Sequence, residues 1–202
     1  MYKYADKAIK QLNRLFVRWF TALRLLKFDE INILPAVKKV YADAKRQMVK
    51  RYESIAVEAY RAALKRAGSD GKGKEPDDDW LLDMLEETDP VTLYQFFPEL
   101  ERKTVRLAEA LEVPQSRQKE IDRSLRYLSL QMSETAIRVT DEATIKGYFD
   151  SGVKHVRWVA REDERTCPVC GQRHNRIYPI NRVPPKPHYG CRCEIIPVLT
   201  DK

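Results

Sequence analysis

Two short segments, C-P-V-C at residues 167–170 and P-P-K-P-H-Y-G-C-R-C at residues 184–193, decide how the end of this chain folds. They hold all four cysteines of the 202-residue sequence, and 20 residues separate the two cysteine pairs. Zinc takes four nitrogen or sulfur ligands in a tetrahedron, and a two-residue spacing lets both sulfurs of a pair turn inward from one tight turn. The spacing therefore predicts a loop that is closed around a structural Zn²⁺.

The second segment offers three donors for two ligand places. Cys191 and Cys193 are two residues apart, so on an extended strand both side chains point to the same face and can share a metal ion. His188 stands three residues before Cys191 and can take the place of either cysteine. The candidate ligands are Cys167, Cys170, Cys191, Cys193 and His188, of which four bind. The sequence leaves open whether the set is all four cysteines or three cysteines with the histidine.

Disulfide bonds are the competing interpretation, because four cysteines allow three pairings. Disulfide scaffolds are typical of small secreted domains, but this sequence opens without the uninterrupted apolar run of a signal peptide. Ordinary buried thiols would not be expected to gather within 27 positions when the first 166 residues contain none. Metal binding is therefore favoured, and a structural zinc ion contributes on the order of 10 kcal/mol to the folding of such a small segment.

Short runs of alternating apolar and polar residues flank the two segments. Residues 153–160 and residues 193–199 each show the two-residue period of a β-strand. We expect these runs to pair as a small antiparallel ribbon that frames the metal loop.

The rest of the chain has the apolar periodicity of long helices. Residues 1–66 form a basic helical region, and residues 78–152 form a second helical region. Between them, residues 67–77 contain three of the seven glycines and predict a flexible linker and a domain boundary. Residues 153–202 are expected to form the small β, zinc-binding module. The predicted fold class is mainly α with a small C-terminal zinc-stapled β module, α+β overall.

Local signals place the ends of several helices. The acidic triplet at residues 77–79 suits the positive end of a helix dipole. The Asp-Pro pair at residues 89–90 predicts the start of another helix, which Pro98 would kink or break. The last long helix is expected to begin after Pro114 and to stop at Gly152.

Charge is unevenly distributed along the chain. Residues 1–66 carry 16 Lys and Arg against 6 Asp and Glu, residues 67–150 carry 11 against 19, and residues 151–202 carry 10 against 5. Segregation of this kind is typical of a chain with separate surfaces for separate partners. Charged residues make up 33% of the chain and the mean hydropathy is −0.56, so no membrane span is expected.

The first predicted helix, residues 1–27, is both basic and amphipathic. Its apolar stripe would most commonly dock on a partner helix, but a basic amphipathic helix can also contact DNA or an anionic membrane. Its aromatic residues favour a contact with another molecule. The candidate nucleic-acid or partner-binding residues are Lys7, Lys10, Arg14, Arg18, Trp19 and Phe20, together with Arg173 and Arg176 of the metal loop.

No catalytic constellation is recognisable in the sequence. The pair His174-Asn175 hints at a zinc-stabilised nuclease of the His-Asn-His type, but the further histidines that such a site needs are missing. The carboxylates at residues 162–164 are expected to form a solvated turn. The chain also lacks a phosphate-binding glycine loop and a nucleophile elbow. We expect that the protein is not an enzyme.

The order W-V-A-R-E-D-E-R-T-C-P-V-C, a basic linker and P-P-K-P-H-Y-G-C-R-C-E-I-I-P-V resembles the C-terminal signature of the phage Mu F-like minor head protein family, a group of head morphogenesis proteins. The matching positions are Trp158, Asp163, Cys167, Cys170, Pro185, His188, Cys191, Arg192, Cys193 and Pro197. The resemblance covers residues 130–199, about a third of the chain. One departure is the turn after C-P-V-C, where Gly171 comes early and Asn175 stands at the turn.

The resemblance implies a structural protein of the virion, present in a low number of copies, inside the head or at its portal vertex and in the host cytoplasm during assembly. The implied partners are the portal protein, the major capsid protein and packaged DNA, and the implied roles are head assembly and genome packaging or delivery. A nucleic-acid-binding zinc protein is the alternative that the residues themselves suggest, from the basic residues 1–66 and the arginines of the metal loop. Its affinity for DNA would fall steeply with salt.

Overall fold

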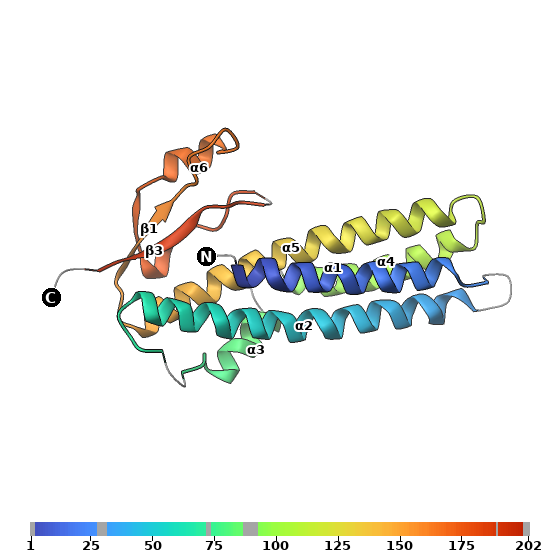
Figure 1. Ribbon diagram of the computed structural model, residues 1–202, viewed down its shortest axis with the longest axis horizontal. Coiled ribbons are helices and arrows are strands. Elements are labelled where there is room, and N and C mark those ends of the chain that lie inside the picture. The colour runs from blue at the N-terminus through green and yellow to red at the C-terminus, as the bar shows by residue number, and fades with distance from the viewer. Residues whose placement is uncertain (1–2, 28–31, 72–73, 87–92, 189, 200–202) are drawn as a thin grey trace.

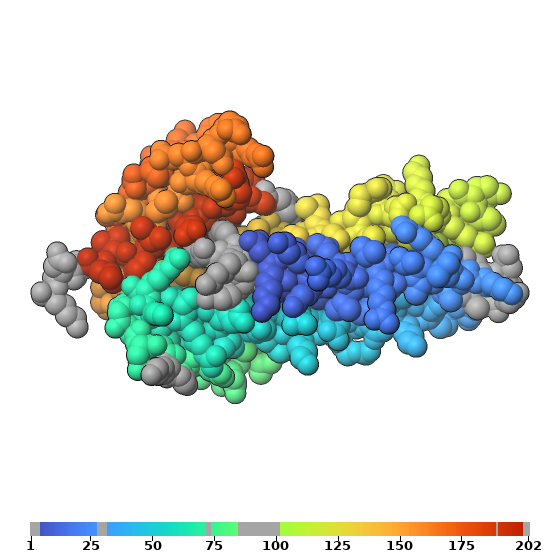
Figure 2. Space-filling view, viewed as in Figure 1, coloured from blue at the N-terminus to red at the C-terminus, as the bar shows by residue number. Residues whose placement is uncertain are grey.

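The computed structural model describes residues 3–27, 32–71, 74–86, 93–188 and 190–199. Long helices run side by side as a bundle, and the C-terminal residues form a smaller lobe beside one end of it (Figures 1 and 2). The elements are α1 (Lys3–Arg24), α2 (Ile33–Arg66), α3 (Asp78–Glu86), α4 (Leu93–Leu111), α5 (Arg117–Asp150), β1 (His155–Val159), α6 (Pro168–Arg173), β2 (Ile177–Pro179), the 3₁₀ turn η1 (Ile180–Arg182) and β3 (Glu194–Val198). The predicted fold class, mainly α with a small C-terminal β module, is confirmed.

The bundle forms because each long helix carries one apolar stripe, and the stripes face one another. On α2 the stripe includes Val37, Tyr41, Met48 and Tyr52, all of which are buried. Side chains of α1, α2, α3, α4 and α5 share this single hydrophobic core. No described helix is long and apolar enough to cross a membrane.

The helices on both sides of the predicted domain boundary at residues 67–77 pack into that one core. Part of the segment also lies against α2. Gly71 is buried near Arg61, and the Nε of Arg61 donates to the carbonyl of Lys74 at 3.0 Å. Composition suggested flexibility here, but the described residues of the segment make contacts that composition does not reveal.

Two further expectations concern helix ends. The Trp80 N–H donates to Asp77 Oδ1 at 3.1 Å, so the acidic triplet does cap α3. Helix α4 runs through Pro98 without a break, and the predicted start at residues 89–90 lies outside the described residues. Helix α5 begins at Arg117 and ends before Gly152, whose φ of +79° is the left-handed conformation expected of a terminating glycine.

Gly147 allows α2 and α5 to approach each other closely. A Cβ atom built there would lie 2.7 Å from the Tyr60 carbonyl oxygen and 2.8 Å from the Cβ of Ala63. Any larger residue at position 147 would push the two helices apart at the end of the bundle that carries the small lobe.

The C-terminal lobe is built on a three-stranded antiparallel sheet with the order β2-β1-β3. Val156 lies opposite Pro197, and Trp158 lies opposite Ile195. The predicted ribbon of residues 153–160 and 193–199 is therefore present as β1 and β3. The additional strand β2 pairs with the other edge of β1.

A second hydrophobic core joins this sheet to the bundle. Trp158 and Ile195 from the sheet pack with Tyr148 from α5 and Ala63 from α2. The Tyr148 hydroxyl also donates to the carbonyl of Ile195 at 3.4 Å. The sheet is therefore seated on the α2–α5 crossing, and this seat fixes where the two cysteine segments project.

Candidate metal centre

The first cysteine pair is shaped by the start of helix α6. Cys167 is the N-cap of this helix and Pro168 is its first residue, a position that proline favours because its missing N–H is not needed there. The cap places the Sγ of Cys167 so that it accepts from the Cys170 N–H at 3.3 Å. One turn thus presents both sulfurs on the same side.

The second segment brings its donors to the same place. Cys170 Sγ lies 3.4 Å from the Nε2 of His188 and 3.6 Å from the Sγ of Cys191. The donor atoms form two groups that share Cys170, one with Cys167 and His188 and one with Cys191 and Cys193, and within each group all atoms lie within 4.8 Å of one another. All five predicted ligands therefore converge.

These separations fit a metal centre and do not fit a disulfide. With Zn–S bonds of about 2.3 Å and Zn–N bonds of about 2.0–2.1 Å, the donors of a tetrahedral zinc site lie roughly 3.5–3.8 Å apart. A disulfide would need sulfurs about 2.05 Å apart, whereas Cys170 and Cys191 are 3.6 Å apart and no disulfide joins any of the four cysteines. Cys170, Cys191 and Cys193 are almost completely buried, while Cys167 is half-buried and His188 is exposed.

The thiols differ in how readily they ionise. The Cys170 N–H bond to Cys167 Sγ, with a further contribution from His188, lowers the pKa of Cys167. Burial, together with the neighbouring cysteines, raises the pKa of Cys170, and burial also raises that of Cys191. Buried thiols of this kind ionise when a cation compensates their charge, and a bound metal ion supplies that compensation.

An ion pair links the two cysteine segments next to the donors. Arg192, between Cys191 and Cys193, donates through Nη1 and Nη2 to the two carboxylate oxygens of Asp163, each at 2.7 Å. The hydrogen bonds from Arg192 are the main reason why the pKa of Asp163 falls to about 2. The carboxylates at residues 162–164 were expected to form a solvated turn, and Asp163 instead holds the metal loop together.

Trp158 packs against basic side chains of the metal loop. It is fully buried, and two cations lie on its ring, the guanidinium of Arg173 at 5.0 Å and the Nζ of Lys186 at 4.9 Å from the ring centre. Arg173 also donates to the carbonyl of Pro185 at 2.7 Å. Arg173, a predicted nucleic-acid or partner-binding residue, therefore has a structural role, whereas Arg176 is exposed.

The candidate residues on α1 divide into two sets. Phe20 is fully buried against Tyr41, with ring centres 6.2 Å apart, and Trp19 is half-buried on the same core. Phe20 is therefore corrected from a partner-binding residue to a core residue. The basic candidates, by contrast, are all exposed and follow one face of the helix: Lys7, Lys10, Arg14 and Arg18.

The nuclease alternative finds no support at His174. Its Nδ1 accepts from the Ala160 N–H at 3.2 Å, so the proton of the neutral ring is on Nε2. That Nε2 lies 3.7 Å from a carboxylate oxygen of Glu162. The bond to Nδ1 ties His174, at the end of α6, to the residue that follows β1.

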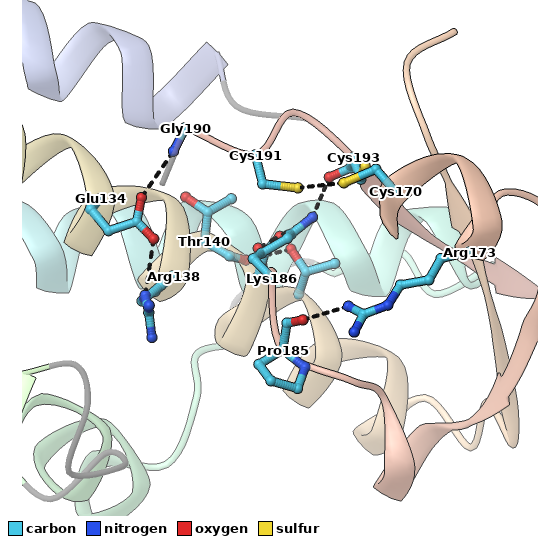
Figure 3. Close-up of polar contacts among 12 residues, drawn as sticks. Glu134, Arg138, Thr140, Cys170, Arg173, Pro185, Lys186, Gly190, Cys191 and Cys193 are labelled. Carbon is cyan, nitrogen blue, oxygen red and sulfur yellow. Dashed lines mark hydrogen bonds and ion pairs between the residues drawn. The ribbon is translucent and has the colours of Figure 1, made fainter. Parts of the chain in front are cut away.

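Sequence reasoning missed the residues that attach the metal loop to α5. Gly190 N–H donates to Glu134 Oε2 at 3.2 Å (Figure 3). The Nζ of Lys186 lies 3.5 Å from Asp141 Oδ2. Glu134 and Asp141 are seven residues apart, which places them on one helix face. The burial of Glu134 and Asp141 is what marks them as attachment residues. Burial cannot be predicted from the sequence here, because the helix is rich in charged residues throughout.

Comparison of the chain with protein-family models, with curated proteins and with solved structures found no match. The site itself must therefore carry the functional argument.

Proposed function

We propose that this protein is a minor head protein of a tailed phage, with a zinc ion that holds its C-terminal module together. In this proposal it is a structural component and not an enzyme, present in a low number of copies per virion and associated with the portal vertex. It acts in head assembly and in genome packaging or delivery. Its partners are the portal protein, the major capsid protein and packaged DNA.

The observation that carries the proposal is the convergence of five donors from two separate segments of the chain. Cys167 and Cys170 meet His188, Cys191 and Cys193, and these are the cysteine and histidine positions of the signature that the chain resembles. Asp163 and Arg192, two further signature positions, form the ion pair beside the donors. The signature residues thus have a common physical purpose, which is to close and brace one metal loop.

Zinc is the ion that we assign to the site. The donors are sulfur and imidazole nitrogen, which zinc and other thiophilic ions prefer over the oxygen ligands of Mg²⁺ and Ca²⁺. Four such ligands leave no open position for a substrate, which is typical of a structural site. When bound, the ion would supply the charge compensation that the buried thiolates need.

Quantitative mass spectrometry of purified phage particles tests this function. We expect the protein in mature particles at a low, reproducible copy number relative to the major capsid protein. Its absence from both mature and immature particles would contradict the proposal.

A nucleic-acid-binding role is the second candidate, and the basic face of α1 favours it. Lys7, Lys10, Arg14 and Arg18 are exposed, and among the described residues none of them pairs with a carboxylate. Electrostatic binding to DNA loses affinity in proportion to the phosphates neutralised, with a slope of about −0.9 per contact on a log–log plot against salt. Replacing all four by glutamine should reduce that slope by up to about 4 if this face binds DNA, whereas an unchanged slope would exclude it.

A further inference from the structure

The second cysteine segment supplies metal donors and also contacts the helical bundle, and both functions fall within the same few residues. The segment after η1, residues 183–193, forms neither helix nor strand in its described part. It contributes the donors His188, Cys191 and Cys193. Between and beside these donors stand Lys186 and Gly190, which contact α5.

The α5 carboxylates in both contacts are buried. The side chains of Lys186 and Asp141 are 6% and 9% exposed, and Glu134 is 6% exposed as a residue. Lys186 also donates to the carbonyl of Cys193, and Arg138 holds Glu134 in place at 3.1 Å, as Figure 3 shows. Buried charges are stable only while they are paired, so these contacts depend on the loop keeping its exact course.

The sheet also packs on the bundle through side chains other than the donors, although Cys170, Cys191 and Cys193 belong to the same hydrophobic core. Tyr148, Ala63 and Ile195 pack in the second hydrophobic core, and Arg66 lies 3.7 Å from a carboxylate oxygen of Glu194. The C-terminal module thus has two attachments, an apolar one at the sheet and a polar one at the loop.

We propose that metal binding and docking of residues 183–193 on α5 are one coupled event, in which the bound ion fixes the loop so that Lys186 and Gly190 reach Asp141 and Glu134. This inference rests on the proposed metal site. Loss of the ion releases the loop from α5 and leaves the sheet on its apolar seat. Coupling is reciprocal by thermodynamic necessity, so disrupting the α5 contacts must weaken metal binding by the same factor.

The first half of the proposal is that the bound ion fixes residues 183–193 on α5. It is tested by hydrogen exchange of the full chain with one equivalent of Zn²⁺ and after chelation. We expect chelation to speed exchange in residues 183–193 and to leave the amides of β1 and of the α5 core unchanged. Equal exchange in residues 183–193 with and without the ion would overturn the coupling. So would a general loss of protection in β1, because the sheet would then have no independent seat. A wild-type chain that takes up no Zn²⁺ would instead remove the metal site itself, which is a different failure.

The second half of the proposal is that the α5 contacts strengthen metal binding. It is tested by measuring the zinc affinity of Asp141→Asn and of Lys186→Met in competition with a chelator. Docking predicts that both variants bind zinc more weakly, by about 5-fold or more, the lower range for coupled sites. A purely electrostatic influence on the thiolates predicts opposite signs, because removing a negative charge near them would tighten binding. Weaker binding by Lys186→Met with tighter binding by Asp141→Asn would therefore overturn the proposal.

The double variant and a matched control complete this experiment. If Lys186 and Asp141 act only through each other, the double variant should bind zinc no more weakly than the weaker single variant, and full additivity would contradict docking. Glu120→Gln removes a carboxylate from the same helix at a site where its partner is Arg123. This control should bind zinc as the wild type does.

Discussion

Arg192 and Asp163 form a two-pronged ion pair with both N···O distances at 2.7 Å. Arg192 is the residue between two candidate metal ligands, and Asp163 lies in the turn that leads to the other two cysteines. The pair therefore links the two cysteine segments and limits how far they can separate. Such parallel bonds need the planar fork of arginine, which lysine cannot reproduce.

Replacing Arg192 by lysine should make the bound metal ion easier to remove. The charge is kept and one of the two parallel bonds is lost, so the opening of the loop is less restrained. Both side chains are partly exposed, and we therefore expect the rate of zinc transfer to a chelator to rise by no more than about 5-fold. Arg182→Lys, at an exposed arginine of the same module, is the control. A rate for Arg192→Lys equal to that of the control would show that the ion pair does not brace the site.

Cys170 should be the ligand whose loss is most damaging. It is the member that both groups of donors share, and five donors for four places leave one to spare elsewhere. Cobalt absorption spectra should show that Cys170→Ala abolishes tetrahedral binding. Among His188→Ala, Cys191→Ala and Cys193→Ala, replacement of the spare donor should preserve the spectrum. His174→Ala is the control for the histidine. A tetrahedral spectrum that survives in Cys170→Ala would contradict this geometry.

Gly147→Ala should destabilise the bundle by about 1–3 kcal/mol, the usual cost of overpacking. Its new methyl group would meet the carbonyl of Tyr60 and the Cβ of Ala63, both backbone or backbone-proximal atoms that cannot rotate away. Urea unfolding followed by circular dichroism at 222 nm measures the change. Gly171→Ala in α6 is the control, because its methyl group would meet nothing within 4 Å. Equal stability of the two variants would refute the close helix crossing.

The bundle should lose stability in alkaline solution through Tyr41. Burial raises the pKa of Tyr41 from its usual 10.0 to about 12. Between these pH values the unfolded chain gives up a proton that the folded chain keeps, so stability falls as the pH rises, by up to about 1.4 kcal/mol per pH unit. Tyr41→Phe removes this titration and should make the decline between pH 10 and 12 shallower by about 1 kcal/mol per pH unit. An identical pH dependence in urea unfolding of the two proteins would contradict the assignment.

Local sequence signals were enough to predict part of this structure. The α2 stripe, the helix stop at Gly152 and the pairing of β1 with β3 all follow from periodicity and turn chemistry within a few residues. The donors of the metal site were likewise identifiable, because cysteines two residues apart have few other uses in such a segment. What these signals have in common is that they act over short distances along the chain.

Features that depend on distant parts of the chain could not be predicted in the same way. Strand β2 has only three residues and includes Pro179, so it has no alternating pattern to detect. In the sequence, Phe20 looks like a partner-binding aromatic residue on a basic helix. Only the position of Tyr41 shows that Phe20 packs inside the bundle. Asp141 and Lys186 are 45 residues apart, and nothing local in either segment points to the other.

We expect the five converging donors to hold one metal ion, and native mass spectrometry of the full chain counts that ion. We expect purified protein to carry one Zn²⁺ per chain, and Cys170→Ala to carry none under the same conditions. A wild-type chain that remains metal-free in the presence of excess Zn²⁺, or a Cys170→Ala chain that still carries one ion, would show that these donors do not form the predicted site.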